Sequence, residues 1–227
     1  MFYWSIKLFH VFRIPLELHA SFFIVPLYLA SESWKTSQWT GVYWSMLTCS
    51  MVFACVVLHE LGHALAARRF GIETERILLL PFGGVAQLRR LPQTATRELL
   101  VTLAGPAVNF TIAALLLPLM TRAPFYGGIP NNARALLDYA VYFNAIMGTF
   151  NLIPVFPMDG GRLLRASLSY KLGFNKATRI TAQLGTFLAV AIGSYSFLVY
   201  KNYHLAALFA FIAFASRKEL KATYRES

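Results

Sequence analysis

Residues 56–66 read VVLHELGHALA and place two histidines and a glutamate inside an otherwise apolar run. Ionisable side chains cost free energy in such surroundings, because little water is there to solvate them. On a helix, His59 and His63 lie one turn apart on the same face, so both imidazoles can bind one tetrahedral metal ion. Glu60 then lies beside the ion as a general base. The stretch predicts a helix that carries a metal site; the alternative is that both histidines only hydrogen-bond to neighbouring helices.

The composition indicates an integral membrane protein. Of the 227 residues, 57% are hydrophobic and only 14% are charged, whereas soluble domains carry about 25% charged residues. Residues 180–200 contain no charged side chain at all. An α-helix needs about 20 apolar residues to cross a bilayer core, so a span of this kind is expected here.

The distribution of the +11 net charge predicts a topology. No basic run is interleaved with aromatic residues, so nucleic-acid binding is not expected. Of the 21 Lys and Arg residues, 17 fall in four segments, at 7–13, 68–97, 162–179 and 217–225. Cytoplasmic loops of membrane proteins carry the excess of Lys and Arg. With six spans, all four segments and both termini are predicted to be cytoplasmic.

The expected fold is an all-α polytopic membrane protein with about six transmembrane helices. The predicted spans are 16–31, 42–67, 99–120, 135–157, 180–200 and 203–216. Residues 75–90, ERILLLPFGGVAQLRR, combine two β-prone runs with a Pro-Phe-Gly-Gly turn. They predict a short β-hairpin or small sheet near the cytoplasmic face. The two cysteines, Cys49 and Cys55, offer no disulfide framework and are expected to be buried apolar residues.

A second polar site is predicted where residues 151–166, NLIPVFPMDGGRLLRA, interrupt the helical pattern. Irregular backbone at membrane depth is tolerated only where protein buries it or a water-filled cavity meets it. A catalytic zinc site usually has three protein ligands, and Asp159 is the predicted third ligand; its alternative role is to form the turn before Gly160. The other aspartate, Asp138, is expected at the outer end of the fourth span. Asn151 is predicted to donate a hydrogen bond to a reacting carbonyl, or else to cap the helix end.

Four segments together resemble the site-2 protease family of intramembrane zinc metalloproteases. They are LHELGHALAARRFGI at 58–72, LLLPFGGVAQL at 78–88, AGPAVNF at 104–110 and NLIPVFPMDGGRLLRA at 151–166. The resemblance is strongest to the compact six-span bacterial and archaeal branch and covers most of the chain. It implies a single intramembrane metalloprotease domain over residues 1–227, with catalytic spans roughly at 42–157. No CBS or PDZ domain is expected.

The resemblance also implies the site residues. The family role of zinc ligand falls on His59, His63 and Asp159, with one Zn2+ per chain, and that of catalytic base on Glu60. Asn151 matches an asparagine thought to bind or polarise the substrate. Asn109 matches a family position and is expected in a structural or substrate-proximal role. His19 and Cys55 are expected to be packed or hydrogen-bonded neighbours, with a role as extra metal ligands as the alternative.

The implied function is hydrolysis of a peptide bond in or near a transmembrane segment of a membrane-bound signalling protein. Such a substrate could be an anti-sigma factor or a membrane-tethered transcription factor, and the enzyme is expected in the cell membrane as a multi-pass protein. A metal transporter is one alternative, but its ligands should line a path to both faces. A catalytically silent relative that binds membrane partners is another, but it typically loses the base or a ligand, and none is missing here.

Overall fold

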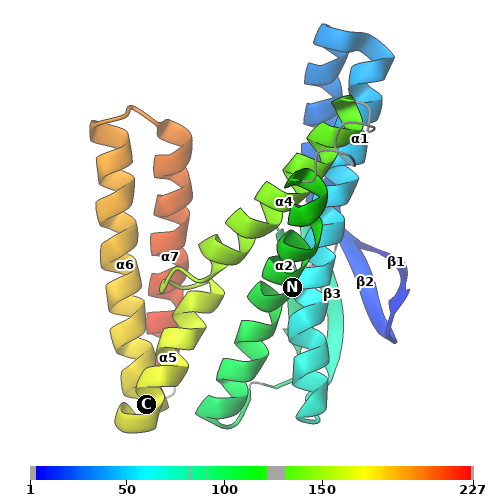
Figure 1. Cartoon of the computed structure of the whole chain (residues 1–227). Coiled ribbons are helices and arrows are strands. Elements are labelled where there is room, and N and C mark those ends of the chain that lie inside the picture. Colours follow the sequence, from blue (N-terminus) through cyan, green and yellow to red (C-terminus); the bar gives the residue numbers. More distant parts are fainter. Residues whose placement is uncertain (1–3, 82, 91, 122–130, 226–227) are drawn as a thin grey trace. The chain divides into compact units, whose positions relative to one another are not determined.

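The computed structural model describes residues 4–81, 83–90, 92–121 and 131–225 (Figure 1). Phe82, within the predicted turn, lies outside these residues. The elements in chain order are β1 (Ser5–Val11), β2 (Ile14–His19), the 3-10 helix η1 (Ala20–Phe23), α1 (Ile24–Arg69), β3 (Thr74–Leu80), β4 (Gly83–Leu88), α2 (Ala95–Thr121), α4 (Asn131–Asn151), α5 (Asp159–Leu172), α6 (Phe174–Leu198) and α7 (Tyr203–Arg225).

The chain forms two compact units. The first comprises residues 1–91 and 104–148, and the second comprises residues 92–103 and 149–227. The first unit therefore holds the sheet, α1, most of α2 and nearly all of α4, whereas the second holds α5, α6 and α7.

Helix α1 contains the second predicted span and the second half of the first. It is kinked at Ser37 and Gln38, whose backbone angles are not helical, and Figure 1 shows the chain turning back on itself at this end of α1. The predicted first span, 16–31, is wrong at its start, because residues 16–19 belong to strand β2. They form a strand because β2 pairs with β1 on one side and with β3 on the other.

The predicted hairpin is confirmed as β3 and β4, which pair antiparallel with Ile77 opposite Ala86. It forms half of a four-stranded sheet with the order β1-β2-β3-β4. The two N-terminal strands were not predicted. Strand β2 runs parallel to β3, with Leu16 opposite Ile77 and Leu18 opposite Leu79, so β4 is an edge strand of the sheet.

The core of the first unit joins the sheet to the HELGH segment of α1. Its buried members come from three elements: Ile14, Leu16 and Leu18 of β2, Val56, Leu61 and Ala64 of α1, and Ile77 and Leu79 of β3. Helix α1 also packs closely on α2 at Gly62, where an added Cβ would lie 2.6 Å from the Ala104 carbonyl oxygen. Small residues allow membrane helices to approach in this way.

The second unit is built around the antiparallel pair of α6 and α7 (Figure 1). Its core combines residues from this pair with residues that precede α5: Val155, Met158, Ala189, Phe209, Ile212 and Ala213. A buried ion pair joins Arg165 of α5 to Glu98 of α2, with Arg165 Nε 3.0 Å from Glu98 Oε1. Burying two charges is costly unless they are paired, so this contact fixes the start of α2 against α5.

Within the part of the chain that the structure describes, three helical stretches are long and apolar enough to cross a membrane: Ala20–Arg69, Ala95–Met120 and Phe174–Leu198. Helices α4 and α7 lie where the sequence predicted the fourth and sixth spans, although α4 ends at Asn151 rather than residue 157. Large apolar side chains point outward, as shown by the exposed fractions of 70% for Phe187 and 68% for Phe214. Lipid contact accounts for such exposure, so the helices form a polytopic membrane fold with a small sheet.

Glu17 connects the central strands of the sheet electrostatically. Its carboxylate accepts hydrogen bonds of 2.7 Å from the Ser5 hydroxyl and from Arg76 Nη1. Burial alone would raise the pKa of Glu17, but the Ser5 and Arg76 hydrogen bonds outweigh it and hold this pKa below its usual value. The ionised carboxylate thus stabilises the fold above its unfolded pKa, and this stability is lost as the pH falls through the folded pKa.

We expect Glu17→Gln to lower the melting temperature at pH 7 by roughly 2–4 °C, the effect of losing about 1 kcal/mol in a chain of this size. The difference from the wild type should shrink as the pH falls through the folded pKa of Glu17, because the wild-type carboxyl is then neutral too. Thermal unfolding in detergent between pH 3 and 8 measures both curves. A difference that stays constant with pH would contradict this role.

Candidate metal centre

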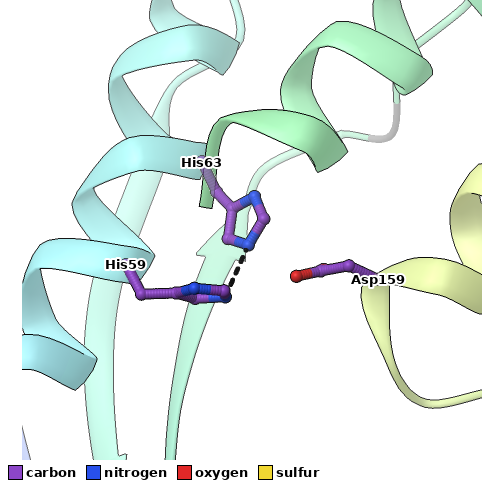
Figure 2. A group of neighbouring side chains, drawn as sticks. All are labelled: His59, His63 and Asp159. Atoms are coloured by element: carbon purple, nitrogen blue, oxygen red, sulfur yellow. Dashed lines mark hydrogen bonds between the residues drawn. The ribbon is translucent and has the colours of Figure 1, made fainter. Parts of the chain in front are cut away.

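Helix α1 brings two imidazoles together edge to face. His59 and His63 are 2% and 7% exposed, and their Nε2 atoms lie 3.1 Å apart (Figure 2). Two nitrogen ligands of a tetrahedral zinc ion, each at 2.0–2.1 Å from the metal, are about 3.3 Å apart. The observed separation is within a few tenths of an ångström of that value, so the pair fits one zinc ion.

Asn109 of α2 orients the first of these imidazoles. Its Oδ1 lies 2.5 Å from His59 Nδ1, and its side chain is completely buried. An amide oxygen can only accept, so His59 Nδ1 carries the proton and Nε2 keeps its lone pair. Metal-binding histidines commonly donate their second nitrogen in this way. The sequence suggested a role near the site for Asn109, and this contact defines it.

Gly105 of α2 leaves space beside both Nε2 atoms. A Cβ at this position would overlap the His63 ring and lie 2.8 Å from His59 Nε2. The only residue that leaves this volume open is glycine, because any larger side chain begins with that Cβ. The absence of a side chain beside two imidazole nitrogens leaves the room that a bound cation requires, and it supports the fit to zinc.

Glu60 turns from α1 towards the edge strand of the sheet. Its Oε2 accepts a 2.8 Å hydrogen bond from the backbone N–H of Ala86 in β4, and the residue is 9% exposed. Gly84 makes room for it, since a Cβ there would lie 2.8 Å from Glu60 Cγ. The sequence predicted that Glu60 lies beside the histidines, but not that it contacts β4.

Asp159 is the first residue of α5, in the second unit, and is 7% exposed (Figure 2). A carboxylate in the first turn interacts favourably with the helix dipole. The chain reaches this helix through a tight turn, in which a Cβ at Gly160 would overlap the carbonyl oxygens of Leu152 and Ile153. The predicted break in the helix is therefore confirmed, and Asn151 ends α4 just before it.

The two further candidates near the motifs make hydrogen bonds of their own. His19 Nδ1 lies 2.7 Å from the Ser21 hydroxyl and accepts from the Ser21 backbone N–H, which caps η1. Cys55 Sγ accepts a hydrogen bond from Asn144 Nδ2 at 3.1 Å. Both were expected to be packed or hydrogen-bonded residues, and the contacts confirm that each is hydrogen-bonded. Asn144 was not singled out from the sequence, although an asparagine within an apolar helix is a signal of a buried polar contact.

We expect Gly105→Ala to reduce the zinc content of the purified protein from about one ion per chain to a small fraction, because the new Cβ fills the space between the imidazoles. Gly148→Ala is the matched control: it also adds a methyl group at a close helix contact, 3.0 Å from the Phe110 ring. Elemental mass spectrometry measures both. Full zinc occupancy in a folded Gly105→Ala protein would show that the ion does not bind there.

Comparison with known proteins identifies relatives over nearly the whole chain. The family model described as "Peptidase family M50" matches residues 47–127 and 125–192. A zinc metalloprotease of Methanocaldococcus jannaschii is 38% identical over 99% of this chain and 63% of its own length. Stage IV sporulation protein FB of Bacillus subtilis is 27% identical over 73% of this chain and 56% of its own length. The chain thus spans about three fifths of the length of these curated relatives.

A solved structure shares the fold as well. A site-2 protease from Methanocaldococcus jannaschii superimposes with a TM-score of 0.69 at 38% identity, covering 96% of this chain and 95% of the other. Sequence, fold and the histidine pair agree: the chain belongs to peptidase family M50, the site-2 protease family of membrane-embedded zinc metalloproteases.

Proposed function

We propose that the protein is an intramembrane zinc metalloprotease that hydrolyses a peptide bond in or near a transmembrane segment of another protein. The observation that carries this proposal is the facing pair of buried Nε2 atoms on α1, with the Glu60 carboxylate on the same turn. Ionisable residues inside a membrane protein are costly and mark functional sites. The names of the relatives supply the reaction type.

The proposed zinc ligands are His59, His63 and Asp159. Two imidazoles and a carboxylate form the donor set of many catalytic zinc sites, which keep the fourth position open. All three side chains are buried and each offers one ligand atom. When bound, zinc supplies Lewis-acid chemistry: it polarises a carbonyl group and lowers the pKa of water.

Glu60 is the proposed general base and acid. Its carboxylate takes a proton from the attacking water and later delivers it to the amine of the leaving peptide. The hydrogen bond from the Ala86 N–H holds one carboxylate oxygen, which leaves the other available for the proton. Asn151 is proposed to donate a hydrogen bond to the carbonyl oxygen as negative charge develops on it.

Strand β4 is the proposed docking edge for the substrate. A helical substrate hides its carbonyl groups in its own hydrogen bonds, so it must be extended before attack. An edge strand can pair with an extended peptide through main-chain hydrogen bonds, and β4 is such a strand beside Glu60. The proposed substrate is a membrane-bound signalling protein, such as an anti-sigma factor or a membrane-tethered transcription factor, and both termini of the protease are proposed to be cytoplasmic.

Two alternative functions would also place histidines and carboxylates inside a membrane protein. A metal transporter needs ligands along a path to both faces, whereas in the first unit the histidines and Glu60 occupy neighbouring turns of a single helix. A catalytically silent relative could bind membrane partners without cleaving them. Proteolysis assays on single-residue variants separate these alternatives from the proposal.

We expect Glu60→Gln to bind zinc normally but to cleave a membrane-protein substrate at least about 100-fold more slowly, the usual contribution of a general base. Glutamine keeps the size and the acceptor oxygen but cannot take up the proton. Glu73→Gln is the matched control, because Glu73 is exposed and pairs with Arg89 at the surface. Undiminished cleavage by the zinc-loaded Glu60→Gln protein would exclude this mechanism.

We expect Asp159→Ala to lower the zinc affinity strongly, because the ion loses its one anionic ligand. Asp138→Ala is the control, since these are the two aspartates of the sequence. Chelator competition on the detergent-purified proteins gives the dissociation constants. Equal constants for Asp159→Ala and the wild type would exclude Asp159 as a ligand while leaving the histidine pair in place.

A further inference from the structure

We infer that Asn109 and Asn144 form a two-amide relay that fixes the tautomer of His59 and presents its Nε2 lone pair to the metal. Both asparagines are positioning residues, since they act through His59. The inference deepens the proposed function, because the relay has a purpose only if His59 binds a metal. Its geometry lies entirely within the first unit.

The two amides are the most deeply buried polar side chains of that unit. Asn109 on α2 and Asn144 on α4 both have no exposed surface. A buried amide without partners costs several kilocalories per mole, so such groups are retained where hydrogen bonds satisfy them. The two amides are hydrogen-bonded to each other: Asn109 Nδ2 donates to Asn144 Oδ1 at 2.8 Å.

The direction of the relay is set by groups that can only accept. Asn144 Nδ2 donates to the backbone carbonyl of Ala140 at 2.8 Å, and a carbonyl has no proton to give. Asn144 therefore presents its oxygen to Asn109, which must meet it with its NH2 group. The same NH2 group also points at the thioether of Met147, another acceptor, at 3.6 Å.

The direction of these hydrogen bonds also determines which group Asn109 presents to the His59 imidazole. With its NH2 group committed to Asn144 and Met147, Asn109 can offer only its oxygen to His59 Nδ1. The ring must then carry its proton on Nδ1, and the lone pair is left on Nε2, which faces His63. A main-chain carbonyl on α4 thus determines, through two amides, which nitrogen of a histidine on α1 can bind a metal.

The relay predicts a graded series of variants. Asn109→Leu removes the acceptor and should weaken zinc binding by about 10–100-fold, the usual effect of losing an outer-shell partner. Asn144→Leu should have a smaller effect, because Met147 still orients the Asn109 amide. Asn109→Asp keeps an acceptor facing His59 but sets its second oxygen against Asn144 Oδ1. It should therefore bind zinc more weakly than the wild type but more tightly than Asn109→Leu, an order that a purely packing role would not explain.

The test combines zinc affinity with a direct reading of the tautomer. Chelator competition gives the dissociation constants, and 15N NMR of histidine-labelled, metal-free protein at about pH 8, where imidazoles are neutral, reports the protonated nitrogen. The His59 signal is identified by its absence in His59→Gln. Thr178→Val is the control for lost buried polarity, since Thr178 is buried and its hydroxyl donates to the Phe174 carbonyl of its own helix.

The expected result is an Nδ1–H tautomer in the wild type and in Asn109→Asp, with mixed tautomers and weaker zinc binding in Asn109→Leu. A folded Asn109→Leu protein with wild-type affinity and an unchanged tautomer overturns the inference. Equal loss of affinity in Thr178→Val does so too, because it makes the effect one of general destabilisation. A wild type that shows the Nδ1–H tautomer but binds no zinc would refute the proposed function, while the control of the His59 tautomer by the two amides would still hold.

Discussion

The fold is organised around the burial of two imidazoles and a carboxylate on one turn of an apolar helix. His59, Glu60 and His63 are all less than one tenth exposed, and groups of this kind are tolerated in an interior only with partners. Each partner comes from a different element: Asn109 on α2 for the first histidine, the Ala86 N–H on β4 for the glutamate. Hydrogen bonds from this one turn of α1 therefore connect the helix both to α2 and to the sheet in the first unit.

Close backbone approach is what makes these partnerships possible. Gly62 brings α1 against α2, Gly84 admits the Glu60 side chain beside β4, and Gly105 leaves the space that both Nε2 atoms face. In the second unit Gly160 plays a similar part, because it permits the turn that starts α5 at Asp159. In each case a methyl group would occupy volume that a functional or main-chain group needs.

Local patterns in the sequence predicted the features that depend on local contacts. The i, i+4 histidines gave the helix face, and the Pro-Gly motifs gave the β3–β4 hairpin and the break before Asp159. The N-terminal strands escaped prediction because β2 is stabilised by parallel pairing with β3, about 60 residues away. The role of Asn144 was not predicted for the same reason. Its partners on α2 and α1 lie 35 and 89 residues away along the chain, so no local spacing indicates these contacts.

The most direct test of the account is the zinc coordination shell itself, measured by X-ray absorption on the purified, zinc-loaded protein. A zinc ion held by His59 and His63 should show two imidazole nitrogens at about 2.0–2.1 Å, completed by oxygen donors and without sulfur. Zinc without imidazole scattering, or with a sulfur at about 2.3 Å, would mean that His59 and His63 do not form the zinc site.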